Sequence, residues 1–358
     1  MPGWSGWWEP SAGSGHDVRE GPLLNLRQAS SRPFNGNLGE AARGYIPVKV
    51  AHLWPGIRLP CEFHLPILVK GEAVPKFVKV FDRGQFYSEQ WWETLRVRQV
   101  TVLYVEEADY HELTAYMEEF VENRLDSSEM SGEEKSGMLY GQAELLVSRI
   151  FSQPHDLETL QDVSRWTEQA ARHLQRDSVT ARMLYAVFSK DYQTYTHSVQ
   201  VCLLGMAFAA YLGWDETETA ELGKGGLLHD IGKIWIDDRI LLKPASLTAQ
   251  EFEKIKEHPK LGHDQLQGLA EVTESVLEIV LRHHESMDGN GYPEGLSGES
   301  IHPYARVAHI VDCFDALTTR RPYKSAISPF KALKLMQDQM MASFDAKFLY
   351  KFVQFLGS

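Results

Sequence analysis

Residues 218–233 read ETAELGKGGLLHDIGK, an apolar helical repeat that closes on a histidine and an aspartate. The pattern predicts a helix ending at His229-Asp230, and Gly232 follows closely, as is typical of a left-handed helix cap. Adjacent side chains at a helix end splay in different directions. An imidazole nitrogen and a carboxylate oxygen placed in this way suit one metal ion or a pair of metal ions. An HD dipeptide alone is common and does not decide the function.

Further ligand-type residues lie at predicted helix ends or on otherwise apolar faces: His197, His258, His283, His284 and Asp312. His197 opens the helix at 197–212, and His258 is predicted to end the helix that starts at Thr248. Asp312 lies in an apolar helix, where a carboxylate without a partner is costly. Each residue taken singly is typical of a satisfied core residue. Together they indicate a metal centre built from facing helices.

Composition limits the function classes. The 358 residues carry a net charge of −13, which argues against broad binding of DNA or RNA, because such binding needs clustered Lys and Arg. Cys61, Cys202 and Cys313 are far apart and are predicted to be free thiols in a reducing compartment. The sequence has neither an apolar run of about 18 residues nor a signal-peptide pattern at its start. We therefore expect a cytoplasmic protein without a membrane span.

The chain is predicted to be α+β, with a small sheet-containing domain before an all-α bundle. Residues 1–43 are rich in Gly, Ser and Pro and predict a flexible tail. Residues 44–125 hold short Val- and Ile-rich strands and predict the small α/β domain. Residues 126–164 begin with a polar stretch, 126–137, and predict a linker and connecting helix. Residues 165–358 predict the helical bundle that carries the histidines.

Several motifs in this order resemble the HD-GYP family, a branch of the HD metal-dependent phosphohydrolases. They are HDIGK at 229–233, HHE at 283–285, DGNGYP at 288–293, DCFDAL at 312–317 and RPY at 321–323. The resemblance covers roughly residues 165–358 and implies an HD-type bundle. It implies hydrolysis of cyclic di-GMP, a bacterial second messenger, to the linear dinucleotide pGpG or on to GMP, by metal-activated hydroxide attack on phosphorus. Residues 44–125 resemble a small domain of unknown function that often precedes HD-GYP domains, and a regulatory or dimerisation role is open.

The resemblance also implies roles for individual residues. The implied metal ligands are His197, His229, Asp230, His258, His283, His284 and Asp312, with Asp230 bridging two metals and serving catalysis. The implied substrate contacts are Lys233, which is also catalytic, together with Arg321, Lys324 and the loop residues Gly289, Gly291, Tyr292 and Pro293. Gln193 stands where three-metal members carry Glu. An amide is a neutral and weaker ligand, so two metals are favoured over three, with iron or manganese suiting the mixed ligands.

Two alternatives to a cyclic di-GMP phosphodiesterase stay open. One is a non-catalytic receptor that senses cyclic di-GMP and signals to protein partners through the N-terminal domain. The other is an HD hydrolase for a different cyclic dinucleotide. The apolar stripes of residues 138–190 suit pairing in a homodimer, and they equally suit packing on the catalytic domain.

Overall fold

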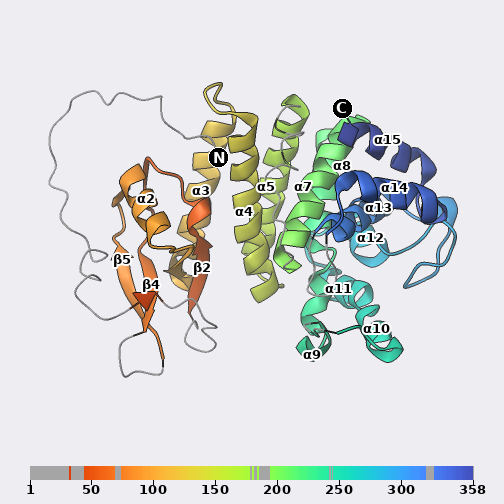
Figure 1. Cartoon of the computed structure of the whole chain (residues 1–358), viewed down its shortest axis with the longest axis horizontal. Coiled ribbons are helices and arrows are strands. Elements are labelled where there is room, and N and C mark those ends of the chain that lie inside the picture. The colour runs from red at the N-terminus through yellow and green to blue at the C-terminus, as the bar shows by residue number, and fades with distance from the viewer. Residues whose placement is uncertain are drawn as a thin grey trace. The chain divides into compact units, whose positions relative to one another are not determined.

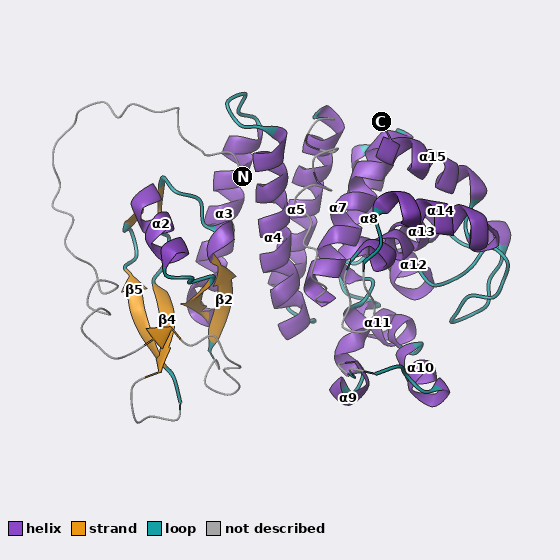
Figure 2. Ribbon diagram, in the orientation of Figure 1, coloured by secondary structure: helices purple, strands orange, loops and turns teal. Residues whose placement is uncertain are grey.

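The computed structural model describes residues 32–33, 44–68, 74–177, 180, 184, 194–241, 243, 245–319 and 326–357. The chain divides into two compact units, Met1–Leu113 and Thr114–Ser358. Among the described residues, the strands all lie in the first unit and the second unit is helical (Figure 2). This confirms the predicted α+β class. Within the described part of the chain, no helix combines the length and the apolar character needed to cross a membrane.

The first unit is built on an antiparallel sheet in the order β1-β4-β7-β2, with β5 also paired to β4 (Figure 1). A separate pair joins β3 to β6. The strands are β1 (Arg32–Pro33), β2 (Tyr45–Lys49), β3 (Ile57–Arg58), β4 (Phe63–Leu68), β5 (Lys76–Phe81), β6 (Phe86–Tyr87) and β7 (Val102–Glu106). Helix α2 (Glu89–Val97) begins where the side chain of Ser88 accepts a hydrogen bond from the amide of Trp91. Strand β1 falls inside the predicted tail, and the rest of residues 1–43 lie outside the described residues.

The second unit is a bundle of helices. Helix α3 (Tyr110–Leu125) begins in the first unit and ends in the second. The other helices are α4 (Gly132–Ser152), α5 (Leu157–Arg176), α7 (Thr194–Leu212), α8 (Glu216–Leu228), α9 (Asp238–Leu241), α10 (Ala249–Ile255), α11 (His258–Leu266), α12 (Glu274–Arg282), α13 (Pro303–Thr318), α14 (Pro329–Gln339) and α15 (Ala346–Gly357). Short 3-10 turns join them, among them η4 (Ile231–Trp235) and η6 (Met341–Ser343).

Helix α8 is central to this bundle and packs against α5, α7 and α12. Its glycines explain how the helices come so close. A Cβ on Gly226 would lie 2.8 Å from the Cα of Cys202 in α7, and one on Gly225 would lie 2.2 Å from the side chain of Ile279 in α12. The GKGG stretch therefore brings the end of α8, with its His-Asp pair, into the middle of the bundle.

The structure corrects two local expectations. Gly232 does not adopt a left-handed cap, because it lies in the 3-10 turn η4 without a positive φ. Its missing side chain serves close packing instead, since a Cβ there would lie 1.9 Å from the carbonyl oxygen of His258. The polar stretch 126–137 is not all linker. Helix α4 begins at Gly132, where Ser131 and Glu134 form a capping box.

Candidate metal centre

The structure brings all the predicted metal ligands together inside the second unit. They come from five places in the bundle: His197 in α7, His229 and Asp230 at the end of α8, His258 in α11, His283 and His284 at the end of α12, and Asp312 in α13. All but His284 are buried, and the side chain of His284 is 23% exposed. The centre therefore has one accessible side, at the His284 end.

The placement of His258 differs from the prediction. It does not end the helix that starts at Thr248, because α10 ends at Ile255 and His258 opens α11. Pro259 accounts for the break, since its ring removes an amide donor and suits only the first turn of a helix. The predicted helix start at Thr248 is confirmed, since Thr248 and Glu251 form the capping box that begins α10.

The ligand-type atoms fall into overlapping groups that share residues. Three triads each have their ligand atoms within 4.8 Å of one another: His258 with His283 and His284, His197 with His229 and Asp312, and His229 with Asp230 and His283. Asp230 lies between the first two triads. Its Oδ1 is 3.2 Å from Nε2 of His258, and its Oδ2 is 3.4 Å from Nε2 of His229. One carboxylate thus faces both groups, the arrangement expected of a bridging ligand.

The backbone fixes which nitrogen of three imidazoles faces the centre. The Nδ1–H groups of His229, His258 and His283 donate to backbone carbonyls of their own preceding turns, at 2.8, 2.7 and 3.0 Å. With the proton on Nδ1, each ring turns an Nε2 lone pair inward. Nε2 of His258 and Nε2 of His283 lie 3.2 Å apart. Two lone pairs at that distance repel each other, and a cation bound by both relieves the repulsion.

Burial favours the neutral, metal-binding form of these rings. It lowers the pKa of His229, and with help from the neighbouring imidazoles it lowers the pKa of His283 and of His284 well below the usual range. Burial alone would raise the pKa of Asp230, but Lys233 and the histidines hold it well below its usual range. Asp230 is therefore ionised and the three rings are neutral at neutral pH.

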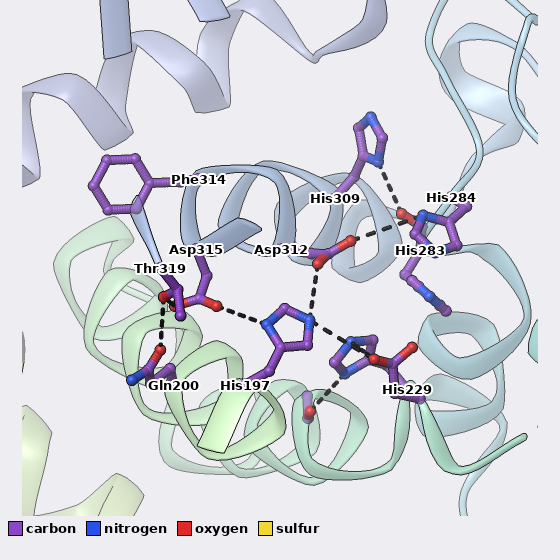
Figure 3. A network of polar contacts seen from close by, with 12 residues as sticks. His197, Gln200, His229, His283, His284, His309, Asp312, Phe314, Asp315 and Thr319 are labelled. Atoms are coloured by element: carbon purple, nitrogen blue, oxygen red, sulfur yellow. Dashed lines mark hydrogen bonds and ion pairs between the residues drawn. The ribbon is translucent and has the colours of Figure 1, made fainter. Parts of the chain in front are cut away.

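His197 is held differently, between two carboxylates (Figure 3). Its Nδ1 lies 2.6 Å from Oδ2 of Asp315, and its Nε2 lies 3.1 Å from Oδ1 of Asp312. Burial alone would lower the pKa of His197, but the hydrogen bonds to Asp312 and Asp315 raise it to about 10. Asp315 orients the ring from behind, as carboxylates do for metal-binding histidines.

These observations fit a divalent transition metal. The donors are neutral imidazoles and ionised carboxylates, the combination that suits iron, manganese and zinc. The Nε2 atoms of His258 and His283 lie 3.2 Å apart with no proton between them, because the proton of each ring is on Nδ1. The clusters are therefore ones that could hold divalent metal ions.

Lys233 lies beside the shared carboxylate. Its Nζ is 2.5 Å from Oδ2 of Asp230, and its side chain is 17% exposed. The 3-10 turn η4 places it one turn after the His-Asp pair, as the sequence spacing predicts. A cation here is available both to Asp230 and to an anion that enters the centre.

The HHE and GYP motifs form one structural unit, which sequence reasoning missed. The buried carboxylate of Glu285 accepts hydrogen bonds from the amides of Glu294, Gly295 and Leu296, at 2.7, 3.1 and 2.8 Å. A carboxylate directly after the paired histidines His283 and His284 therefore sets the path of the loop. The sequence signal was present in the third letter of the HHE motif.

The loop residues themselves lie against the centre. A Cβ on Gly291 would lie 2.3 Å from the amide nitrogen of Ser286, and Gly289 has a φ of +78°, so both positions require glycine. The ring of Tyr292 packs on His284 with centroids 4.7 Å apart, and the Tyr292-Pro293 peptide is cis. The loop thus forms a wall of the accessible side.

A second set of residues supports the ligands from behind, and the sequence did not reveal it. His309 Nδ1 donates to the carbonyl oxygen of His283 at 2.8 Å (Figure 3). Its Nε2 lies 3.1 Å from Oγ of Ser343. The Ser286 hydroxyl lies 2.9 Å from the same Ser343 hydroxyl. These contacts join α13 and η6 to the turn that carries His283 and His284.

Three predicted site residues, Gln193, Arg321 and Lys324, lie outside the described residues.

Comparison with known proteins agrees with this geometry. Residues 186–348 match the family model described as HD domain. The chain is 40% identical over 169 residues to a cyclic di-GMP phosphodiesterase of Pseudomonas aeruginosa, an alignment that covers 47% of this chain and 41% of the relative. It is 30% identical over 181 residues to a 3'3'-cGAMP-specific phosphodiesterase of Vibrio cholerae, covering 49% of this chain and 39% of the relative. The chain thus spans about two fifths of the length of these relatives.

A solved structure shares the fold. It is described as an HDG"Y"P protein from Bdellovibrio bacteriovorus, with a TM-score of 0.69, 18% identity, and coverage of 88% of this chain and 100% of that one. The clustered His and Asp residues lie within residues 186–348 of the second unit, the part that matches an HD domain. Residues 186–348 are thus similar to HD domains, and the resemblance to the HD-GYP branch is confirmed by relatives named as cyclic di-GMP phosphodiesterases.

Proposed function

We propose that this chain is a metal-dependent phosphodiesterase that hydrolyses cyclic di-GMP to the linear dinucleotide pGpG, to GMP, or to both. The observation that carries the proposal is Asp230, a buried carboxylate that faces two histidine groups and lies 2.5 Å from Lys233. The relative from P. aeruginosa is named for this activity and shares 40% identity with this chain over 169 residues.

Each residue has a role in this proposal. Divalent metals held by His197, His229, Asp230, His258, His283, His284 and Asp312 would neutralise a phosphodiester and bring the pKa of a bound water toward about 7, as in the best-studied zinc case. Lys233 exchanges its contact with Asp230 for a non-bridging phosphate oxygen and stabilises the charge that develops there. Tyr292 and the loop of Gly289, Gly291 and Pro293 shape the substrate's entrance. Arg321 and Lys324 complete the phosphate contacts.

The proposal includes two metal ions, iron or manganese, with Asp230 between them. A third metal is not included, because Gln193 supplies a neutral amide where a carboxylate would be needed. The proposed domains are a tail at 1–43, an N-terminal α/β domain at 44–125, a linker and connecting helix at 126–164 and the catalytic domain at 165–358. The N-terminal domain has a regulatory or dimerising role in this proposal. The proposed partners are a second copy of the chain, or signalling proteins that bind the N-terminal domain.

The test is turnover by the purified chain with bound manganese or ferrous iron. Asp230→Asn keeps the size of the side chain but removes the charge that both groups share, so we expect hydrolysis to fall by more than about a hundredfold. Asp238→Asn, an exposed residue of α9, is the matched control and should keep full activity. Near-normal turnover by Asp230→Asn, with metal content unchanged, would sink the proposal.

A second candidate function follows from the relatives named for 3'3'-cGAMP. In the proposed mechanism the metal centre acts on a phosphodiester, not on the bases. Both cyclic di-GMP and 3'3'-cGAMP contain phosphodiesters, so the centre suits either nucleotide. A panel of cyclic dinucleotides assayed side by side distinguishes the two enzymes. A metal-loaded chain that binds cyclic di-GMP and leaves it intact would instead indicate a receptor.

A further inference from the structure

One cation near the centre is not used by the proposed chemistry. Lys256 ends α10, two residues before the ligand His258. Its Nζ lies 5.7 Å from the ring centroid of Phe252 and 5.6 Å from that of Tyr292. Its ion pair with Glu253 spans 2.8 Å, but the Glu253 side chain is 68% exposed, so water and salt weaken this pair. Two aromatic rings thus hold an ammonium group whose donors remain open to exchange.

These residues adjoin the accessible side of the metal centre. Tyr292 packs on His284, and burial together with Asp312 and Asp230 raises the pKa of its phenol. Tyr292 is therefore close enough to Asp312 and Asp230 to feel their charges. The same ring also contacts Lys256. Phe252, one helical turn before Lys256, is 48% exposed. From His284, the ring of Tyr292, the ammonium of Lys256 and the half-exposed ring of Phe252 thus follow one another at 4.7, 5.6 and 5.7 Å.

Resting on the proposed function, we infer that Phe252 and Lys256 form the subsite for a guanine base of the cyclic dinucleotide. A base stacks on an aromatic face such as that of Phe252, whereas a phosphate gains nothing from it. The ammonium of Lys256 donates to O6 and N7, the two acceptors on one edge of guanine. Adenine carries an amino group in place of O6 and offers Lys256 only N7. The pair therefore selects guanine.

The experiment compares cyclic di-GMP with cyclic di-AMP, which has no guanine, in turnover and in binding. Binding is measured on the full chain with Mn²⁺ and the Asp230→Asn background, which separates affinity from hydrolysis. Lys256→Met keeps the length of the side chain and removes its donors. It should lower the preference for cyclic di-GMP by about tenfold. Lys256→Arg should keep the preference, and Lys260→Met, an exposed residue of α11, is the matched control.

Replacing Phe252 is expected to change the binding affinities in a different way. Phe252→Leu removes the ring and should weaken both nucleotides by about tenfold, leaving their ratio unchanged. An unchanged ratio in Lys256→Met would overturn the inference, as would an equal affinity of the parent chain for both nucleotides. A chain that binds guanine selectively through Lys256 but hydrolyses neither nucleotide would refute the phosphodiesterase proposal and support the base subsite.

Discussion

His197 shows how one residue depends on a partner that does not touch the metal. Asp315 lies 2.6 Å from its Nδ1 and leaves Nε2 to face Asp312 and the centre. Replacing Asp315 by Asn keeps the shape but removes the charge that orients and polarises the ring. Metal affinity should fall by about 10- to 100-fold. Titration calorimetry with Mn²⁺ measures this, and Asp338→Asn on the exposed face of α14 is the control. An unaltered affinity would contradict the assigned role of Asp315.

The same residue predicts a pH dependence. The pKa of His197 is raised to about 10, so in the metal-free protein the ring carries a proton on each nitrogen at neutral pH. A metal must displace the proton from Nε2. Binding should therefore release about one proton from this site, and affinity should rise with pH from about 7 to about 9. Calorimetry in buffers of different ionisation enthalpy measures the proton. A binding enthalpy that does not change with the buffer would disprove it.

At this scale the sequence predicted which residues converge in the bundle, but not the residues that support them. The converging residues are His and Asp at helix ends or on apolar faces, and such placement can be recognised along the chain. Asp315 and His309 also lie in α13, yet nothing in their spacing shows that one faces His197 and the other faces the carbonyl of His283. Those contacts depend on how α13 packs against α7 and α12, which is a property of the folded bundle.

At the scale of the element, the glycines of α8 determine how closely the helices approach. Gly226→Ala would place a Cβ 2.8 Å from the Cα of Cys202, so α7 must move. We expect the free energy of unfolding to fall by about 1–3 kcal/mol. Gly205→Ala in α7 is the matched control, because its Cβ would lie 3.6 Å from Leu222, an ordinary contact. It should stabilise the protein by up to about 1 kcal/mol. Urea unfolding measures both, and equal effects would contradict the packing argument.

Helix boundaries also show where sequence reasoning failed. Both His258 and Gly232 were assigned to the ends of helices by local rules. The actual arrangement depends on the contact between them, because η4 and α11 meet where Gly232 approaches the carbonyl of His258. A tertiary contact of this kind overrides a local cap signal.

At the scale of the whole molecule, metal binding is expected to stabilise the second unit. The ligands come from helices far apart in sequence and converge only in the folded state. A metal at a hundred times its dissociation constant should therefore add about 2.7 kcal/mol to the free energy of unfolding. Thermal unfolding with excess Mn²⁺ and then with a chelator measures the difference. The Asp230→Asn chain should show a smaller shift, and an identical shift would place the stabilising metal elsewhere.

Consecutive residues of the tripeptide His283-His284-Glu285 have two different roles. The histidines face the metal centre, and the glutamate anchors the loop that walls it. A substitution of Glu285 removes the anchor of the loop, and a change in chain length between the histidines and the glutamate removes it as well. One residue inserted after His284 would turn the glutamate away from the loop amides while leaving both imidazoles in place. The site therefore depends on the spacing of this tripeptide as well as on the identity of its members.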